Sequence, residues 1–115
     1  MTGADLAWWT DFKSYQPPEE DLQRFRRELV ARARAVRDKG WRPYWYEWTA
    51  NDVMGTALVL GDGQLLDTGD TDAALQVWAC ELFGHAAGWD DIRGGLVRTR
   101  AWFSQARTQL DTDRP

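Results

Sequence analysis

The sequence predicts a small α+β domain in which a three-stranded antiparallel sheet carries helices mainly on one face, in the order α-α-β-β-β-α-α. Apolar residues recur at helical spacing before residue 40 and after residue 70. Between them lie an aromatic run at 41–48 and an apolar run at 54–69 that glycines interrupt. Three antiparallel strands with helices on one face accommodate that order. The 115 residues suffice for one domain, expected to span 1–110, with 111–115 as a frayed tail.

Two helices are expected before residue 40. Residues 5–15 have the pattern of a short amphipathic helix, which the following Pro17-Pro18 ends. Residues 19–39 give the clearest helical pattern in the chain, because acidic residues in the first turn complement the helix dipole and Gly40 supplies a C-terminal cap. The apolar stripe of this second helix consists of Leu22, Phe25, Leu29, Ala33 and Val36.

Three strands are expected in the middle of the chain. Residues 41–48 (WRPYWYEW) are rich in aromatic residues, and Pro43 favours an edge strand or a strand start. Residues 49–52 then form a turn. Residues 54–69 have the pattern of a hairpin, with the strands TALVL and QLLDT joined by the turn Gly61-Asp62-Gly63.

Two further helices complete the expected fold. Asp70 or Thr71 can cap a helix that runs to about Phe83 and that Gly84 closes; it is apolar on most of its circumference, which indicates burial. A last helix is expected from near Trp89 to about Leu110, with Asp90 and Asp91 in its first turn, although Gly94-Gly95 weakens its start.

The composition favours a cytoplasmic protein. A single cysteine, Cys80, excludes an intrachain disulfide and favours a reducing compartment. The N-terminal residues lack the basic start and apolar run of a secretory signal, and no stretch is apolar over the length that crosses a bilayer, so no membrane association is expected. The eight tryptophans predict either a dense core or an interaction surface.

Charge is segregated along the chain. Residues 43–92 contain nine acidic residues and no Lys or Arg, whereas residues 19–42 carry eight Lys or Arg against five acids. A span without cations argues against a nucleic-acid-binding surface there, because phosphate contacts need positive charge. The alternative is that the acidic loops pair with arginines of the flanking helices when the chain folds.

One motif resembles a catalytic signature. Leu65-Leu66-Asp67-Thr68-Gly69 is similar to the active-site motif of aspartic proteases, whose mechanism would need two such aspartates face to face. That family has a small residue where this chain has Asp70, and it is almost wholly β, whereas helical patterns flank the motif here. A turn with a helix N-cap at Asp67–Thr71 is therefore the preferred interpretation, and no enzymatic activity is predicted.

Other sites are excluded by their context. Asp70, Asp72 and Glu81 have the spacing of an EF-hand loop, but Ala74 and Leu75 occupy a ligand and the obligatory glycine position. Cys80 and His85 are too few for a metal site, and Cys80 is expected in the core. Residues 19–84 resemble double-stranded-RNA-binding domains in element order, but Thr71 and Asp72 stand where that family has lysines. No metal or cofactor is expected.

The aromatic run is the predicted binding site. We expect a non-enzymatic protein–protein interaction module, such as a small inhibitor, immunity or accessory factor of the phage or mobile-element type. The alternative is that helix 19–39 and the Trp8-Trp9 segment cover both faces of the run. The partner is another protein, with a homodimer as an open alternative. The predicted contacts are Trp41, Tyr44, Trp45, Tyr46 and Trp48, with Asp62 from the adjoining acidic loop.

Nucleic-acid binding is the alternative function. Arg93, Arg100 and Arg107 recur every seven residues along the expected last helix, so they lie in a row. Such rows are commonly solvated helix faces, but they can also contact phosphates or an acidic partner. Binding of this kind would weaken steeply as salt concentration rises.

Overall fold

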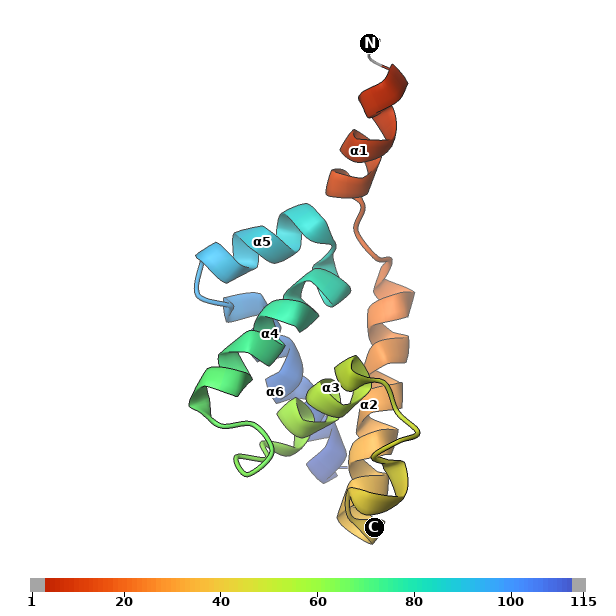
Figure 1. The fold of residues 1–115 in the computed structure, drawn as a ribbon, viewed down its shortest axis with the longest axis vertical. Coiled ribbons are helices and arrows are strands. Elements are labelled where there is room, and N and C mark those ends of the chain that lie inside the picture. The colour runs from red at the N-terminus through yellow and green to blue at the C-terminus, as the bar shows by residue number, and fades with distance from the viewer. Residues whose placement is uncertain (1–3, 113–115) are drawn as a thin grey trace.

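Helices make up the whole fold, and the predicted α+β class is wrong. The structure is a computed structural model that describes residues 4–112 of the chain (Figure 1). Within those residues there is no strand and hence no three-stranded sheet. The elements are α1 (Ala4–Ser14), α2 (Glu19–Lys39), the 3-10 turn η1 (Arg42–Tyr44), α3 (Ala50–Leu60), α4 (Thr68–Phe83), α5 (His85–Arg93) and α6 (Val97–Thr112).

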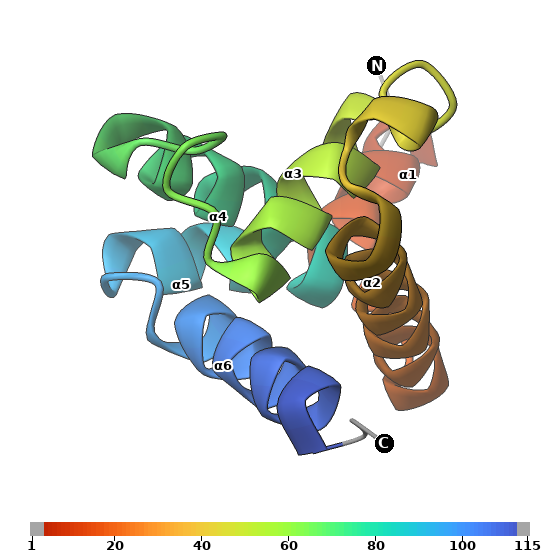
Figure 2. The same ribbon diagram turned by 90° about the horizontal axis from the view of Figure 1, so that it is seen from below.

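Helix α3 lies at the centre of the bundle. It packs against α2, α4 and α6, and α5 covers the end of α4 (Figures 1 and 2). Helix α1 contacts α5 and projects beyond the bundle, so the molecule is elongated, with extents of 56 × 29 × 27 Å. The central position of α3 explains why Ala57 and Val59, on different sides of it, are both fully buried.

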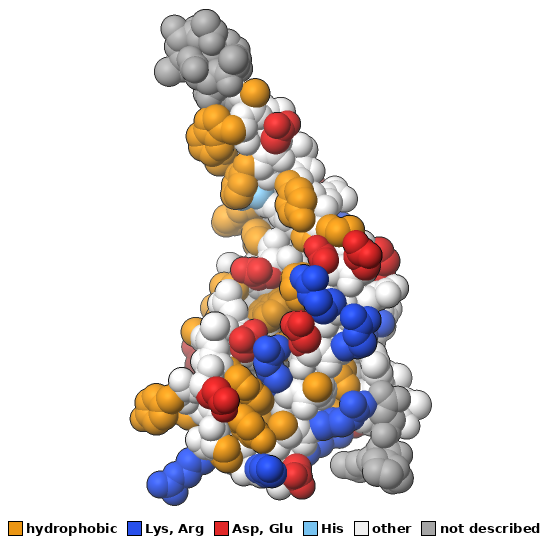
Figure 3. Space-filling view, turned by 90° about the vertical axis from the view of Figure 1, so that its right-hand side faces the viewer, with side chains coloured by type: hydrophobic (Ala, Val, Ile, Leu, Met, Phe, Trp, Pro, Cys, Tyr) orange, Lys and Arg blue, Asp and Glu red, His pale blue; other side chains and the backbone are white. Residues whose placement is uncertain are grey.

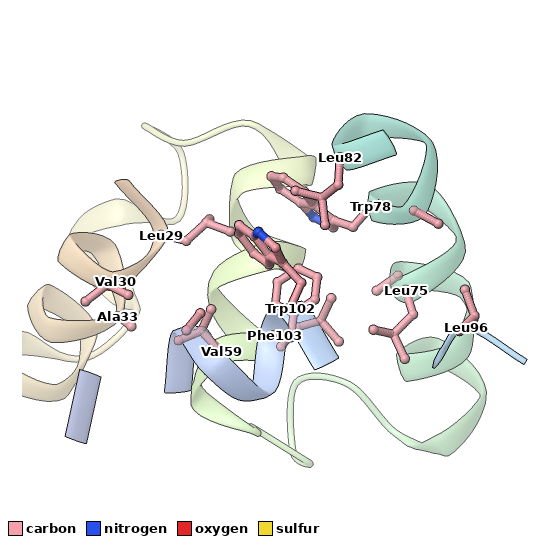
Figure 4. Close-up of a cluster of buried hydrophobic side chains, with 14 of the residues drawn as sticks. Leu29, Val30, Ala33, Val59, Leu75, Trp78, Leu82, Leu96, Trp102 and Phe103 are labelled. Atoms are coloured by element: carbon pink, nitrogen blue, oxygen red, sulfur yellow. The ribbon is translucent and has the colours of Figure 1, made fainter. Parts of the chain in front are cut away.

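Two tryptophans anchor the hydrophobic core (Figure 4). Trp78 of α4 is 5% exposed, and its indole Nε1 donates a hydrogen bond to the backbone oxygen of Asn51 at 3.0 Å. Its ring meets Phe25 of α2 and Phe103 of α6 edge to face, at centroid distances of 6.3 and 5.9 Å. Trp102 lies beside Phe103 and is equally buried. The tryptophan content is thus partly explained by the core.

The two N-terminal helices are confirmed. Helix α2 has the bounds expected from its pattern, with an acidic first turn and a C-cap at Gly40 whose backbone N–H donates to the oxygen of Val36. Its stripe supplies Leu29, Ala33 and Val36 to the core. Helix α1 occupies nearly the expected range, but it does not cover residues 41–48 as one alternative required, because it lies against α5.

The predicted hairpin at 54–69 is instead helix α3 followed by a loop. The side chain of Thr49 caps the helix by accepting a hydrogen bond from the backbone N–H of Asp52 at 3.1 Å. Gly61 ends it in the left-handed conformation (φ 66°, ψ 38°), and its N–H donates to helix carbonyls. A short apolar run has the same composition in a buried strand as in a buried helix. In this chain the caps at Thr49 and Gly61 identify the run as a helix and not a strand.

Helix α4 begins at Thr68, so neither Asp70 nor Thr71, the two caps predicted from the sequence, is its N-cap. Its N-cap is Asp67, whose carboxylate accepts a hydrogen bond from the backbone N–H of Asp70 at 2.9 Å. The hydroxyl of Thr71 donates to the backbone oxygen of Asp67 at 2.8 Å, which closes the first turn. The Asp-Thr-Gly motif thus has the predicted turn and N-cap geometry, and Gly84 ends the helix as expected.

The single C-terminal helix expected from Trp89 to Leu110 is wrong. Gly94, Gly95 and Leu96 separate α5 from α6, and Leu96 adopts a positive φ of 63° while its side chain is buried. The carboxylate of Asp91 caps α6 by accepting hydrogen bonds from the backbone N–H groups of Arg98 and Thr99, both at 2.9 Å. Residues 111 and 112 of the expected tail are helical, and 113–115 lie outside the described residues.

The Asp91 cap gives the first testable prediction. Burial alone would raise the pKa of Asp91, but the Thr99 hydroxyl and the backbone N–H groups hold that pKa below its usual 3.8. We expect Asp91→Ala to lower the free energy of unfolding by about 2 kcal/mol at neutral pH, since buried donors lose a charged acceptor. A lowered folded-state pKa means that this contribution is complete above about pH 4 and is lost as pH falls further.

Urea unfolding at neutral and acid pH measures this effect. Asp90→Ala is the matched control, because Asp90 is exposed and pairs only with Arg93 on the surface among the contacts shown. We expect the Asp90 variant to stay within about 0.5 kcal/mol of the parent. Equal losses in the two variants at neutral pH would contradict the capping role of Asp91.

Candidate functional site

Residues 41–48 form a compact turn and not the predicted strand. The rings of Trp41 and Trp45 meet edge to face at 6.5 Å, and those of Tyr44 and Trp48 stack at 4.4 Å with 8° between their planes. Each pair is separated by four residues, which is the spacing of neighbours on a helical turn. Strand alternation therefore does not hold in this segment, and Tyr46 stands apart at 97% exposed.

Asp62 fastens this turn to the loop after α3. Its Oδ2 atom accepts a hydrogen bond from the indole Nε1 of Trp41 at 2.9 Å. Its Oδ1 atom accepts from the backbone N–H groups of Gln64 and Leu65, both at 3.0 Å. The bond from Trp41, with those from the backbone, lowers the pKa of Asp62 against the effect of burial. Asp62 thus orients the aromatic turn, and its carboxylate is engaged within the chain.

An apolar groove of about 400 Å³ opens beside the aromatic turn. Of the six predicted contacts, only Trp45 and Trp48 line it, and Trp45 is 46% exposed. Trp41 meets Trp45 edge to face and Tyr44 stacks on Trp48, so they support these two rings from within the turn. The full lining is Trp45, Trp48, Ala50, Val53, Met54, Leu65 and Leu66.

Sequence reasoning missed the floor and the far wall of this groove. Val53 and Met54 come from the first turns of α3, and Leu65 and Leu66 come from the loop before α4. These residues were assigned to a turn and a hairpin. The signal that would have placed them was the N-cap at Thr49, since a helix starting there turns Val53 and Met54 toward the aromatic segment.

Acidic residues adjoin the groove in the chain. Glu47 lies between the two lining tryptophans, and Asp67 directly follows Leu66; both are exposed. Arg32 of α2 is the nearest cation to Trp48 among the ring contacts described, at 5.7 Å from the ring centroid. Its charge is offset by Asp52, whose carboxylate lies 3.7 Å from the Arg32 guanidinium. The lining of the groove is therefore apolar, and its neighbours in the sequence at positions 47 and 67 are acidic.

The predicted arginine row is split between two helices. Arg93 ends α5 and pairs with Asp90, whereas Arg100 of α6 pairs with Asp72 at 3.0 Å. Arg107 donates to the backbone oxygens of Leu58 and Val59 at 3.0 and 2.9 Å, where it satisfies carbonyls at the end of α3. Arg100 and Arg107 also line a hollow of about 390 Å³ between α6 and the loop after α3.

Pairing between the acidic span and the flanking helices is confirmed at two positions. Arg32 of α2 meets Asp52, and Arg100 of α6 meets Asp72. Both pairs are partly exposed, so each contributes little to stability. Their effect is on the surface charge, because they neutralise cations that a nucleic-acid interface would use.

The other polar candidates do not assemble into a site. His85 packs against the rings of Trp9 and Phe12, at centroid distances of 5.9 and 5.6 Å. Cys80 is half-buried, and burial, with the charge of Glu81, raises the pKa of its thiol. Within residues 4–112, no three His, Cys, Asp or Glu side chains are grouped to hold a metal ion.

Comparison with known protein families, curated proteins and solved structures finds no significant match to this chain. Among the helices of the described part of the chain, none combines the length and apolarity that crossing a membrane requires. The candidate function therefore depends on the groove and its surroundings alone.

Proposed function

We propose that this protein is a non-enzymatic binding module that holds a segment of another protein in the groove beside Trp45 and Trp48. The observation that supports it is a tryptophan left 46% exposed at the border of an otherwise apolar groove. Tryptophan is the residue most enriched among energetic hot spots of protein interfaces. The contacts of Trp41 with Trp45 and of Tyr44 with Trp48 favour binding, because they restrict the two groove rings before a partner arrives and so leave less side-chain freedom to be lost.

The chemistry of the border indicates the occupant. Apolar grooves of this size accept two or three large side chains from one face of an amphipathic helix. Glu47 and Asp67 are sequence neighbours of groove residues and are exposed, and no Lys or Arg occurs between residues 43 and 92. A segment with apolar anchors flanked by lysines or arginines complements this surface in both shape and charge.

Such binding fits a small inhibitor, immunity or accessory factor, including one carried by a phage or mobile element. These proteins act by occupying a surface of another protein, which requires neither a metal nor a cofactor. The free thiol of Cys80 supports the cytoplasm as the compartment, since a half-buried cysteine without a partner persists most readily under reducing conditions.

Selection from a random peptide display library tests both the groove and the chemistry of its occupant. We expect the enriched peptides to carry Leu, Phe or Trp anchors flanked by Lys or Arg. Synthetic copies should bind the parent protein and lose at least about tenfold in affinity for Trp45→Ala, which corresponds to about 1.4 kcal/mol. Glu47→Lys should also weaken binding, and more so at low salt.

Tyr46→Ala is the matched control. Tyr46 lies in the same turn and is 97% exposed, but it does not line the groove. Peptide affinity should therefore be unchanged in this variant, and both aromatic variants should keep the thermal midpoint of the parent. Peptides that bind Trp45→Ala as tightly as the parent protein, or selected peptides that are acidic, would overturn the proposal.

A further inference from the structure

Helix α1 and the residue that follows it carry an aromatic stripe that the rest of the chain, within residues 4–112, leaves open. Trp8 and Phe12 are four residues apart, so they share one face of α1, and Tyr15 directly follows the end of that helix at Ser14. They are 66%, 53% and 58% exposed. Figure 3 shows hydrophobic side chains gathered along this projecting helix, above the body of the molecule. Large aromatic rings in such a row are unusual on a monomer surface.

The stripe continues onto α5 through ring contacts. Trp9 stacks on Phe12 at 5.6 Å, and both rings meet His85. His85 in turn contacts Trp89, which is 44% exposed. The result is one contiguous aromatic surface across α1 and α5, and Trp45 of the groove lies outside this set of contacts.

Helix α1 lacks the packing that its length requires. An isolated helix of 11 residues is not stable in water, so its stability must come from tertiary contacts. Its contact with α5 covers the flank that bears Trp9, which is the least exposed of the aromatic rings on α1. The face that bears Trp8 has no comparable cover within the described residues.

We propose that this surface is the interface of a symmetric dimer of this chain. Two copies of α1 that pair antiparallel about a two-fold axis near Phe12 place Trp8 of each copy near the end of the other helix, where Tyr15 follows. Such an interface is self-complementary, because the same stripe serves both sides. Helix α1 projects along the 56 Å axis of the molecule, so the two bodies point away from each other in this arrangement.

The exposed area is sufficient for such a dimer. The uncovered parts of the five rings amount to about 500 Å² in each copy, at about 200 Å² for a whole aromatic side chain. Two copies together then bury about 1,000 Å², which is the size at which specific interfaces begin. The five rings are Trp8, Trp9, Phe12, Tyr15 and Trp89.

Charge favours a second copy over an unlike partner. Asp11 and Lys13 are the charged residues of α1 beyond its first turns, and they cancel. Lys13 lies 5.8 Å from the Trp9 ring, and Arg93 pairs with Asp90 beside Trp89, so the surface carries charges of both signs without a net excess. An aromatic surface without net charge is best matched by another aromatic surface, and this chain provides one.

Sedimentation equilibrium on the full chain tests the dimer. We expect twice the mass of the chain at tens of micromolar, and the monomer mass for Trp8→Lys and for Phe12→Lys. Trp8 is 66% exposed, so Trp8→Lys should keep the helical circular dichroism of the parent. Phe12 also packs on Trp9 and His85, so the Trp8 variant decides the test. Trp45→Lys is the matched control and should remain dimeric, because Trp45 lies in the groove.

A cysteine variant tests the antiparallel arrangement. In a Cys80→Ala background, Phe12→Cys should form an interchain disulfide with oxidised glutathione, since the two-fold axis brings both copies of position 12 together. Ala7→Cys should not, because Ala7 lies off the stripe. A monomeric parent chain, a dimer that persists in both lysine variants, or cross-linking at Ala7 in place of Phe12 would overturn the inference. Peptide binding in the groove is measured separately, so a monomeric chain would not contradict the proposed function.

Discussion

Replacing Gly84 with alanine should destabilise the protein by at least about 3 kcal/mol. Gly84 joins α4 to α5 with φ 87° and ψ 176°, a backbone conformation that is essentially restricted to glycine and costs other residues about 1–3 kcal/mol. An added Cβ would also overlap the backbone carbonyl oxygen of Tyr15 in the linker between α1 and α2. Backbone atoms cannot rotate away as a side chain can, so the linker must shift.

Gly40 provides a control that separates the two effects. It ends α2 with φ 76° and ψ −178°, nearly the conformation of Gly84, but nothing lies within 4 Å of an added Cβ. Gly40→Ala should therefore show the conformational cost alone. The larger loss in Gly84→Ala, measured by urea unfolding, then reports the packing of the linker on the bundle. Equal losses at the two glycines would mean that the linker moves freely.

Helix α2 could be predicted because its local signals agree. In α2 the acidic first turn, the spacing of Leu29, Ala33 and Val36, and Gly40 all indicate the same helix. The glycines at 94 and 95 were recognised as weakening a helix, but not as ending one. What ends it is the buried carboxylate of Asp91, which caps a second helix from seven and eight residues away. Such a cap depends on the path of the chain between the two helices.

Composition alone could not show that the segments expected to be central strands are a turn and a helix. The run from Val53 to Leu60 is apolar except for Thr56 because α3 is packed on several sides, so it shows neither a period of two nor of 3.6 residues. The aromatic run at 41–48 has high β-propensity, but that propensity reflects packing on a sheet, and no sheet is present in residues 4–112. Stacking at a spacing of four residues stabilises the turn instead.

The wrong fold class affected the prediction of some residues of the candidate site but not of others. Trp45 and Trp48 were selected for their residue type, and that choice does not depend on secondary structure. The partners of these two residues do depend on it, because Met54 and Leu66 meet them through the packing of α3 and its loop. Asp62 was selected as an acidic contact, whereas its carboxylate holds Trp41 in place. One alternative places the Trp8-Trp9 segment over the aromatic run, whereas the helix that carries it contacts α5.

Trp78 should be the most sensitive position in the core. Its ring joins α2 through Phe25 and α6 through Phe103, and its indole N–H satisfies the carbonyl of Asn51 in α3. We expect Trp78→Ala to lower the free energy of unfolding by about 3–5 kcal/mol, measured by urea unfolding at neutral pH. Trp45→Ala is the control and should cost less than about 1 kcal/mol, because Trp45 is 46% exposed. Similar losses would contradict the assignment of core and groove.

The close approach of Trp78 to Gly55 predicts that the effect of Gly55→Ala on stability changes sign when Trp78 is replaced. A Cβ added at Gly55 would lie 2.6 Å from Cζ2 of the Trp78 indole, so Gly55→Ala should destabilise the parent protein by about 1–3 kcal/mol. Phenylalanine at position 78 lacks the outer part of the indole. In a Trp78→Phe background the alanine therefore fills space, and its higher helix propensity, worth about 1 kcal/mol, makes Gly55→Ala neutral or stabilising. A double-mutant cycle measures this coupling, and additive effects would show that α3 and α4 do not pack through this pair.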